Sequence, residues 1–390
     1  MERIWVSISD VLFFQEGPGV RNTQYTTGGV KLLNVANLVD GKVDLTTSDR
    51  YISEEEAYGK YKHFLCDVGD FIIASSGIKV EYIDKKMGFI DETMLPLCMN
   101  TSTIRFKVLD ENQLRIRYFM YYLKSRHFKN QLFKQITGSA QLNYGPSHLK
   151  KMIMPLIPLN KQDEIIACMD KVQSVIEMKQ QELIRLDDLI KARFVEMFGK
   201  CHNMATIEDL CLIITDGTHN PPKFQDKGIP FIFVSNLADN KVTYNTEKYI
   251  SEETYDELIK RTPIEKGDVL LSTVGSYGHP AVVVEDKKFL FQRHIAYMKP
   301  KHDLIDSFYL HGALLAPDGQ RQIEEKVKGI AQKTLNLSEI RKIRIPVPSM
   351  DKQKEFKTFI ETIAKSKVAI QKSLEETQLL FDSLMQKYFG

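Results

Sequence analysis

The second half of this chain repeats the first. Short segments recur in the same order, between 191 and 199 residues apart. Five such matches are hard to attribute to chance, and a period of about 195 residues is far longer than that of solenoid repeats. The chain is therefore predicted to hold a duplicated domain. The matching pairs are residues 35–38 (VANL) and 234–237 (VSNL), 51–55 and 249–253 (YISEE in both), 69–72 (GDFI) and 267–270 (GDVL), 138–141 (GSAQ) and 329–332 (GIAQ), and 197–199 (MFG) and 388–390 (YFG).

Each copy combines two kinds of sequence. Residues 1–158 and 200–348 are mixed: residues 103–108 (TIRFKV) alternate as a strand does, and residues 71–74 (FIIA) and 281–284 (AVVV) indicate buried strands between glycine-rich turns. Residues 161–198 and 352–389 contain no glycine or proline and are predicted to be long helices. A proline-containing stop precedes each helix, at Pro155 and Pro158 and at Pro346 and Pro348.

Both predicted helices carry a long apolar seam. Steps of four and three from Ile165 to Met197, and from Phe356 to Tyr388, meet eight apolar residues in ten positions. This spacing is typical of a coiled coil, and a helix of 38 residues is about 57 Å long, more than one domain would cover. We expect the helices to cover each other as a spacer. The alternative is that each packs only on its own domain, and the seam lysines Lys179 and Lys367 leave parallel and antiparallel pairing open.

Composition limits the function classes. The chain has 390 residues, with 53 basic and 51 acidic ones, so any nucleic-acid binding would need charge segregated onto one face or a partner's help. The five cysteines form no CxxC pair, which predicts reduced thiols and no zinc site. No apolar run approaches the roughly 18 residues of a membrane span and no signal segment opens the chain, so we expect a soluble, cytoplasmic protein.

Several local motifs mark the loop at the start of each mixed region, a central strand and turn, and a Pro-x-x-Pro exit before each helix. They are residues 16–19 (EGPG), 215–219 (TDGTH) with Pro221, 267–272 (GDVLLS), 274–278 (VGSYG), 155–158 (PLIP) with Gln162, and 345–348 (IPVP) with Gln353. In this order and duplicated, they resemble the recognition domains of one family, the specificity subunits of type I restriction–modification enzymes. The resemblance covers essentially the whole chain.

The resemblance implies an α+β fold. Two duplicated mixed target-recognition domains, residues 1–158 and 200–348, would be separated by two long helices, residues 159–199 and 349–390. The helices would form a coiled-coil spacer with pseudo-two-fold symmetry. The first copy lacks the Asp-Gly-Thr-His sequence and has a shorter turn at residues 75–77. We interpret these departures as a sign that the two domains read different sequences.

The resemblance also implies a non-catalytic role. In that family each recognition domain binds one half of a split double-stranded DNA target, and the helices set the spacing and hold two methyltransferase (modification) subunits. Those subunits bind S-adenosylmethionine and methylate adenine. Motor-nuclease (restriction) subunits join the full complex. This chain would itself hold no cofactor or metal, with S-adenosylmethionine, ATP and Mg in the partner subunits, and no membrane would be involved.

Polar loops at matching places in the two copies are the candidates for reading base edges, because Arg, Lys, Asn, Gln, Ser and Thr read bases in the major groove. Loops on a rigid scaffold commonly carry such residues, although polar loops are more often simply solvated. The candidates in the first copy are Arg21, Asn22, Thr23, Gln24, Tyr25, Ser75, Ser76, Lys79, Gln141, Asn143 and Tyr144. Those in the second are Thr218, His219, Asn220, Ser276, Tyr277, His279, Gln292, Arg293, His294, Lys333, Thr334 and Asn336.

Basic residues just before the helices are the candidates for phosphate contacts, which position a protein on DNA without specifying sequence. They are Lys150 and Lys151 in the first copy and Arg341 and Lys342, with Arg344, in the second. The alternative is an ordinary basic surface.

Other functions find less support. Residues 220–223 (NPPK) resemble an amino-methyltransferase motif, but Lys stands at its fourth position and no glycine-rich cofactor loop precedes it. No Walker loop is present, and the acidic residues around 318–325 are too close together for a metal nuclease site. A coiled-coil adaptor that binds only proteins remains the alternative, and it would show an apolar patch in place of a concave basic face.

Overall fold

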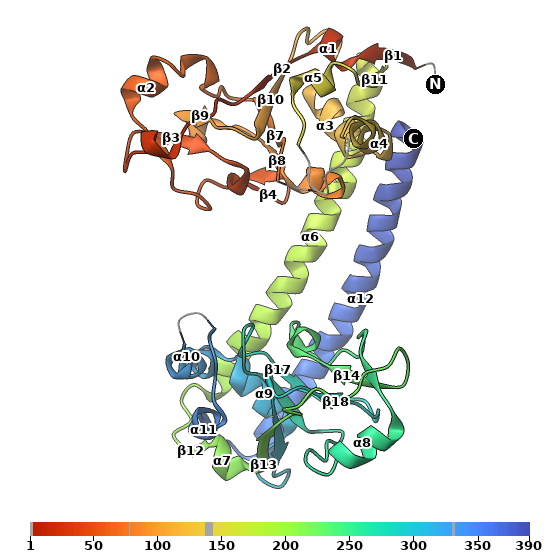
Figure 1. The fold of residues 1–390 in the computed structure, drawn as a ribbon. Coiled ribbons are helices and arrows are strands. Elements are labelled where there is room, and N and C mark those ends of the chain that lie inside the picture. Colours follow the sequence, from red (N-terminus) through yellow and green to blue (C-terminus); the bar gives the residue numbers. More distant parts are fainter. Residues whose placement is uncertain (1–2, 78, 137–142, 330–331) are drawn as a thin grey trace. The chain divides into compact units, whose positions relative to one another are not determined.

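The computed structural model describes residues 3–77, 79–136, 143–329 and 332–390. The chain forms two compact units, residues 1–178 with 374–390 (unit 1) and residues 179–373 (unit 2). Two helices of 40 residues, α6 (Leu159–Phe198) and α12 (Met350–Phe389), each belong partly to unit 1 and partly to unit 2 (Figure 1). They start two residues earlier than predicted, directly after the proline stops.

Unit 1 is built around a four-stranded antiparallel sheet in the order β2-β10-β7-β8. A smaller sheet, β6-β3-β9, and two ribbons, β1-β11 and β4-β5, complete it. The elements are β1 (Ile4–Ser7), α1 (Ile8–Val11), β2 (Leu12–Glu16), β3 (Val30–Leu33), β4 (Leu38–Val39), β5 (Lys42–Val43), β6 (Tyr51–Ile52), α2 (Glu54–Tyr58), β7 (Phe71–Ala74), β8 (Met87–Phe89), β9 (Leu97–Met99), β10 (Thr103–Val108), α3 (Ile116–Lys124), α4 (Arg126–Gln135), α5 (Pro146–Leu149) and β11 (Ile153–Leu156).

Unit 2 repeats the two sheets and the β1-β11 ribbon of unit 1, but its described residues hold no counterpart of the β4-β5 ribbon. Its sheets run β13-β19-β16-β17 and β15-β14-β18, with a β12-β20 ribbon, and in both small sheets the third strand is parallel to the middle one. The elements are β12 (Met204–Thr206), α7 (Ile207–Leu210), β13 (Cys211–Asp216), β14 (Ile229–Ile232), β15 (Tyr249–Ile250), α8 (Glu252–Leu258), β16 (Val269–Ser272), β17 (Pro280–Val282), β18 (Leu290–Phe291), β19 (Ile295–Pro300), α9 (Ser307–Leu315), α10 (Pro317–Lys326), α11 (Leu337–Arg341) and β20 (Arg344–Pro346).

The predicted duplication is confirmed, because the two sheets share one strand order. Two predicted strands match β7 and β10, which are central in their sheet and buried on its core face. The strand predicted at residues 281–284 instead spans Pro280–Val282, and Val284 beyond its end is 48% exposed.

The repeated motifs have structural roles. In the shared YISEE sequence a short strand leads into a helix, and the hydroxyls of Ser53 and Ser251 accept hydrogen bonds from the amides of Glu56 and Thr254. Serine is a favoured residue at this position, and the glutamates after it suit the positive end of the helix dipole. Such local requirements explain why these segments are alike in the two copies.

The long helices contact each other within each unit. In unit 1 the buried Ile165 and Met169 of α6 share a core with Phe381 and Met385 of α12. In unit 2 Phe194 of α6 packs against Phe356 of α12 with ring centroids 5.4 Å apart. No residue of either predicted seam is exposed, so the coiled-coil prediction is confirmed. The helices also pack on the mixed regions, but the alternative that each packs only on its own domain is wrong, because they contact each other as well.

The helices pair antiparallel, which the sequence left open. Within unit 2 the Nζ atom of Lys179 donates to the carbonyl oxygen of Ser373 at 2.9 Å, and Lys367 forms an ion pair with Asp187 at 2.7 Å. As residue numbers increase along α6, the numbers of the contacting residues on α12 therefore decrease. Both seam lysines are satisfied at the helix contact.

The described helices include none that is long and apolar enough to cross a membrane. All five cysteines are free thiols, and Cys66, Cys98 and Cys211 are buried. Burial raises the pKa of the Cys98 and Cys211 thiols to about 12. That these thiols stay reduced remains a prediction.

Candidate nucleic-acid interface

The loops predicted to read DNA in the second copy meet at one end of the large sheet of unit 2. The amide of Thr218 donates to the carbonyl of Phe291 at 2.9 Å, and the amide of Arg293 donates to the carbonyl of Thr218 at 3.0 Å. The loop after β13 and the loop before β19 are therefore joined through their main chains.

Two further loops join them. The amide of Thr273 donates to the carbonyl of His294 at 2.9 Å, and the amide of Leu335 donates to the carbonyl of Thr273 at 2.8 Å. Gly275 donates to the carbonyl of Lys333 at 3.2 Å. Four loops that are distant in sequence thus form one surface on a rigid scaffold, as loop-borne binding sites usually do.

A hollow of about 490 Å³ lies between these loops. Four of the predicted residues line it: Arg293, His294, Thr334 and Asn336. Burial, followed by the neighbouring Arg293 charge, lowers the pKa of His294, which favours the neutral imidazole. The other lining residues are Asp216, Thr273, Val274, Gln332, Leu335, Leu337 and Ser338.

Asp216, which lines this hollow, contacts two basic side chains. One carboxylate oxygen lies 2.8 Å from Nη2 of Arg261, and the other lies 2.8 Å from Nε2 of His219. The Asp216 side chain is only 18% exposed, whereas those of His219 and Arg261 are 48% and 54% exposed. Asp216 therefore holds two exposed donors. Arg261 is not among the predicted residues, because it follows α8 and its local sequence gives no signal of a partner 45 residues away.

The other predicted residues of the second copy have varied surroundings. Tyr277 donates to Glu324 at 3.0 Å, and Lys333 lies 3.4 Å from the Tyr277 hydroxyl, whose hydrogen bond is the main cause of the raised pKa of Lys333. Asn220 and Ser276 are exposed and Gln292 is half-buried. His279 lies apart from the hollow's lining, with its Nδ1 atom 3.1 Å from Oδ1 of Asn240.

The first copy builds the same scaffold with different side chains. Ser75 donates from its amide to the carbonyl of Ser102 at 2.8 Å, as Thr273 does to His294. Tyr144 donates to the carbonyl of Ser75 at 3.0 Å, as Leu335 does to Thr273. The bridge between Ser76 and Asn143 matches the one between Val274 and Thr334.

Burial separates the predicted residues of the first copy into two groups. The side chains of Ser75 and Tyr144 are 1% and 2% exposed, and the Tyr144 hydroxyl donates to the carbonyl of Ala74 at 3.0 Å. These two residues support the loops from inside. Ser76 is half-buried and Asn143 exposed, so their side chains are accessible. Gln141 lies outside the described residues.

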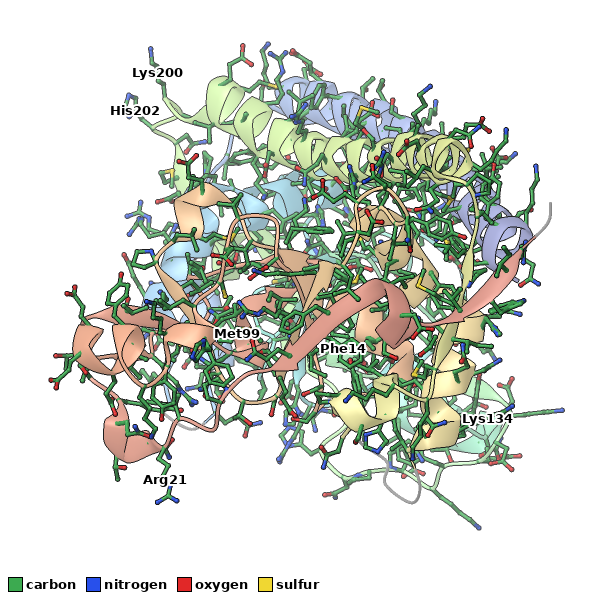
Figure 2. The ribbon with its side chains drawn as sticks, turned by 90° about the horizontal axis from the view of Figure 1, so that it is seen from above. Phe14, Arg21, Met99, Lys134, Lys200 and His202 are labelled. Atoms are coloured by element: carbon green, nitrogen blue, oxygen red, sulfur yellow. The ribbon has the colours of Figure 1, made fainter. Side chains whose placement is uncertain are left out.

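The segment after the Gly-Pro-Gly turn forms one short turn of 3-10 helix over Asn22–Gln24. Gln24 donates to Glu56 at 2.6 Å, and the Tyr25 hydroxyl accepts from Arg50 at 3.4 Å, so both are held within unit 1. Arg21, Asn22 and Thr23 are exposed, and the Arg21 side chain points away from the ribbon in Figure 2.

Lys79 belongs to a basic hollow that the sequence analysis did not predict. It lines a hollow of about 480 Å³ together with Lys85 and Lys86. Tyr82, which is 51% exposed, lies under the ammonium of Lys85 at 5.6 Å from its ring centroid. Lys79 precedes the 3-10 helix of residues Val80–Lys85, Lys85 ends it and Lys86 follows it, and together the three lysines can contact a phosphate backbone.

The predicted phosphate contacts divide similarly. Lys150 and Lys151 are exposed, and neither forms an ion pair among the described residues. Lys342 is exposed but forms an ion pair with Glu339 at 3.0 Å. Arg341 donates to the main-chain carbonyl of Ile214 at 2.6 Å and therefore supports β13. Arg344 is exposed on β20.

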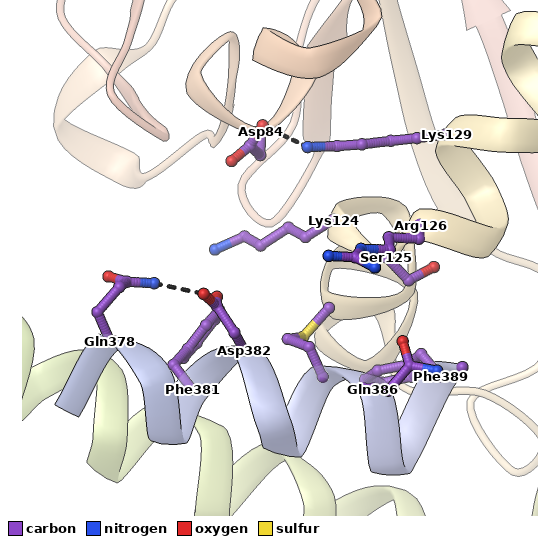
Figure 3. Close-up of a pocket in the computed structure, with 12 residues that line it drawn as sticks. Asp84, Lys124, Ser125, Arg126, Lys129, Gln378, Phe381, Asp382, Gln386 and Phe389 are labelled. Carbon is purple, nitrogen blue, oxygen red and sulfur yellow. Dashed lines mark hydrogen bonds and ion pairs between the residues drawn. The ribbon is translucent and has the colours of Figure 1, made fainter. Parts of the chain in front are cut away.

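Another hollow of unit 1, about 490 Å³, lies between the α3–α4 junction and the end of α12 (Figure 3). Lys124 points into it, and Lys129 pairs with Asp84 at 2.9 Å across its edge. Burial lowers the pKa of Lys124. None of the predicted candidates lines this hollow.

Metal ligands are not grouped: across residues 3–77, 79–136, 143–329 and 332–390, no three His, Cys, Asp or Glu side chains could hold one ion together. Glu324, which the sequence analysis considered for a nuclease site, accepts from Tyr277 and lies 3.5 Å from Lys333. Its contacts are those of a structural surface residue.

Comparison with known proteins places this geometry in a family. The sequence model described as type I restriction modification DNA specificity domain matches residues 8–187 and again residues 202–378. The chain is 30% identical to the type I restriction enzyme EcoBI specificity subunit of Escherichia coli over 41% of this chain and 33% of that protein. It is 24% identical to the MjaVIII specificity subunit of Methanocaldococcus jannaschii over 45% of this chain and 41% of that one. The matches thus span less than half of either relative.

Solved structures share the fold over the full length. The type I restriction–modification S subunit of M. genitalium superposes with a TM-score of 0.51 at 16% identity, covering 100% of this chain and 96% of that one. A chain from the structural study of complex assembly and conformational transition of the type I R-M system gives 0.56 at 17% identity, covering 99% and 97%. With both copies matched, the chain belongs to the family of type I restriction–modification DNA specificity domains.

Proposed function

We propose that this chain is the DNA sequence-specificity subunit of a type I restriction–modification enzyme, and that each copy reads one half of a bipartite double-stranded target. One observation carries the proposal. The main-chain hydrogen bonds that join Ser75 to Ser102 and Thr273 to His294 are equivalent, while the side chains on this shared scaffold differ. A common frame with different reading groups suits two domains that recognise different base sequences.

The long helices serve as spacer and as docking surface. The apolar seams of the two helices are covered in the helix pair. Other apolar side chains on these helices are exposed, including Met178 and Leu189 on α6 and Val368 and Leu379 on α12. We assign these side chains to contacts with a protein partner. Two modification subunits would dock here, and motor-nuclease subunits would join them in the complete enzyme in the cytoplasm.

The chain itself performs no catalysis in this proposal. S-adenosylmethionine, ATP and Mg are assigned to the partner subunits, which would methylate adenine or translocate and cut DNA. The contribution of this chain is to position those subunits on a chosen sequence, with its phosphate contacts fixing the register and its loop side chains reading base edges.

The experiment is to copurify the chain with its neighbouring gene products and to map methylated adenines in DNA treated with the resulting complex. We expect methylation within one asymmetric, bipartite sequence. Methylation without sequence preference would contradict the proposal. If the chain instead assembled with proteins on its helices and had no effect on DNA binding, it would be the adaptor.

A further inference from the structure

Two carboxylates occupy equivalent positions in the two copies. Glu16 ends β2 and Asp216 ends β13. The next residue makes the same bond in both cases: Gly17 donates to the carbonyl of Thr103 at 2.9 Å, and Gly217 donates to that of Ile295 at 3.2 Å. Both carboxylates therefore lie at the end of the large sheet where the candidate loops meet.

Their surroundings differ. Both oxygens of Asp216 are engaged by cationic or donor side chains, those of Arg261 and His219, each at 2.8 Å. Glu16 accepts one hydrogen bond, from the Ser75 hydroxyl at 3.3 Å, and forms no ion pair within the described part of the chain.

Glu16 is also built into the loop junction. Its other oxygen, Oε2, faces Gly145, in the loop that carries Asn143. A Cβ atom added to Gly145 would lie 3.2 Å from this oxygen. Burial, and after it the Glu16 charge, raises the pKa of Tyr144 well above its ordinary value. The carboxylate is therefore fixed between two candidate reading loops.

A carboxylate held near DNA is repelled by the phosphates unless it accepts a hydrogen bond there. In the major groove, the exocyclic amino groups of cytosine and adenine are the donors, whereas guanine presents two acceptors that suit arginine. Resting on the proposed function, we infer that Glu16 is a specificity-determining acceptor for a base amino group in one half-site. Asp216 is instead a positioning residue that aims Arg261 at acceptors in the other half-site.

The test uses the complex of the full chain with its modification subunits and duplexes that carry the mapped target. Single bases in each half-site are replaced by analogues that lack only the amino group, purine for adenine and pyrimidin-2-one for cytosine. At one position of one half-site this deletion should weaken binding of the wild-type complex about tenfold. The Glu16→Met complex should show no loss on deletion at that position, and Glu16→Gln, which keeps an acceptor oxygen, should recover part of the discrimination.

Affinity for non-specific DNA separates this role from a structural one. Removing an unpaired carboxylate should leave non-specific binding unchanged or stronger, whereas damage to the fold should weaken it. Glu111→Met, at an exposed position of unit 1, is the matched control and should leave both readouts at the wild-type level. If deletion of the amino group weakened binding by the wild-type and Glu16→Met complexes equally at every position, the inference for Glu16 would fail.

The second copy is tested by coupling. Replacing guanine by 7-deazaguanine at one position of the other half-site should weaken binding by the wild-type complex. Asp216→Asn and Arg261→Gln should each abolish this sensitivity to 7-deazaguanine. The double variant should bind the target no more weakly than either single variant. Independent, additive losses would refute the positioning role. If the wild-type complex had no sequence preference at all, the proposed function itself would fail, which keeps the two failures distinct.

Discussion

A buried glutamine anchors the start of each long helix, and replacing it should destabilise its unit. Gln162 is 0% exposed; it donates to the carbonyls of Ile157 and Gln113, each at 2.8 Å, and accepts from the amide of Arg115 at 2.8 Å. Gln353 makes the equivalent bonds to Pro348, Leu304 and Asp306. Each side chain thus satisfies three main-chain groups at the junction of helix and mixed region.

Gln162→Leu fills a similar volume but leaves all three groups without that partner. The bond to Ile157 is buried and should cost about 1–3 kcal/mol, while the other two are part-buried and should cost about 0.5–1.5 kcal/mol each. The expected loss is therefore about 2–6 kcal/mol. For a unit of this size each kcal/mol lowers the melting temperature by about 2–4 °C, so a shift on the order of 10 °C is expected.

The assay is thermal unfolding, with hydrogen exchange to assign the loss to one unit. Gln162→Leu should weaken unit 1 and Gln353→Leu should weaken unit 2 by a similar amount. Gln180→Leu, on the exposed face of α6, is the matched control and should shift the melting temperature little. Equal, small shifts in all three variants would refute the anchoring argument.

Three further predictions concern charged groups, and a fourth concerns the cofactor. Asp70→Asn should cost unit 1 about 3 kcal/mol in urea unfolding, because it leaves the buried Arg105 guanidinium without its carboxylate. In unit 2 burial raises the pKa of Asp268 above its ordinary value of 3.8. The stability that this group contributes is therefore full below pH 3.8 and is lost as pH rises through the raised pKa of the folded state. Asp268→Asn should flatten this fall in the free energy of unfolding with pH, and an unchanged pH profile would contradict the prediction. Lys150→Ala should weaken binding of the assembled complex to all sequences alike and reduce the salt slope by about 1, whereas a loss confined to one target would contradict phosphate contact. Calorimetry of the isolated chain should detect no binding of S-adenosylmethionine, and stoichiometric binding would refute its assignment to the partner subunits.

Much of the fold followed from the sequence, because repeated local requirements leave repeated motifs. The shared YISEE sequence marks a strand and a capped helix in both copies, and the 3.5-residue seams identified the helix pair. Helix direction did not follow, because it depends on contacts such as Lys367 with Asp187 that join residues 180 positions apart. The strand predicted at residues 281–284 spans Pro280–Val282 in the structure. A run of similar apolar residues does not indicate at which residue a strand begins or ends.

The candidate site was predictable at the level of loops and less so for side chains. Loop positions follow from the repeat, and the structure brings the loops of each copy together. The side chains of Tyr144 and Arg341 are polar and lie in the predicted places, yet one is buried and the other supports β13. Arg261 and the Lys85–Lys86 pair lie outside the matched motifs, so only the folded structure places them beside the predicted residues.

The central claim is that the two copies read separate half-sites. The most direct measurement replaces residues 200–348 with the equivalent region of a relative and maps methylated sites of the assembled complex. One half of the target should change, while the other half and the spacing set by the helices persist. If both halves changed together, the copies would not be independent readers, and the account would be contradicted.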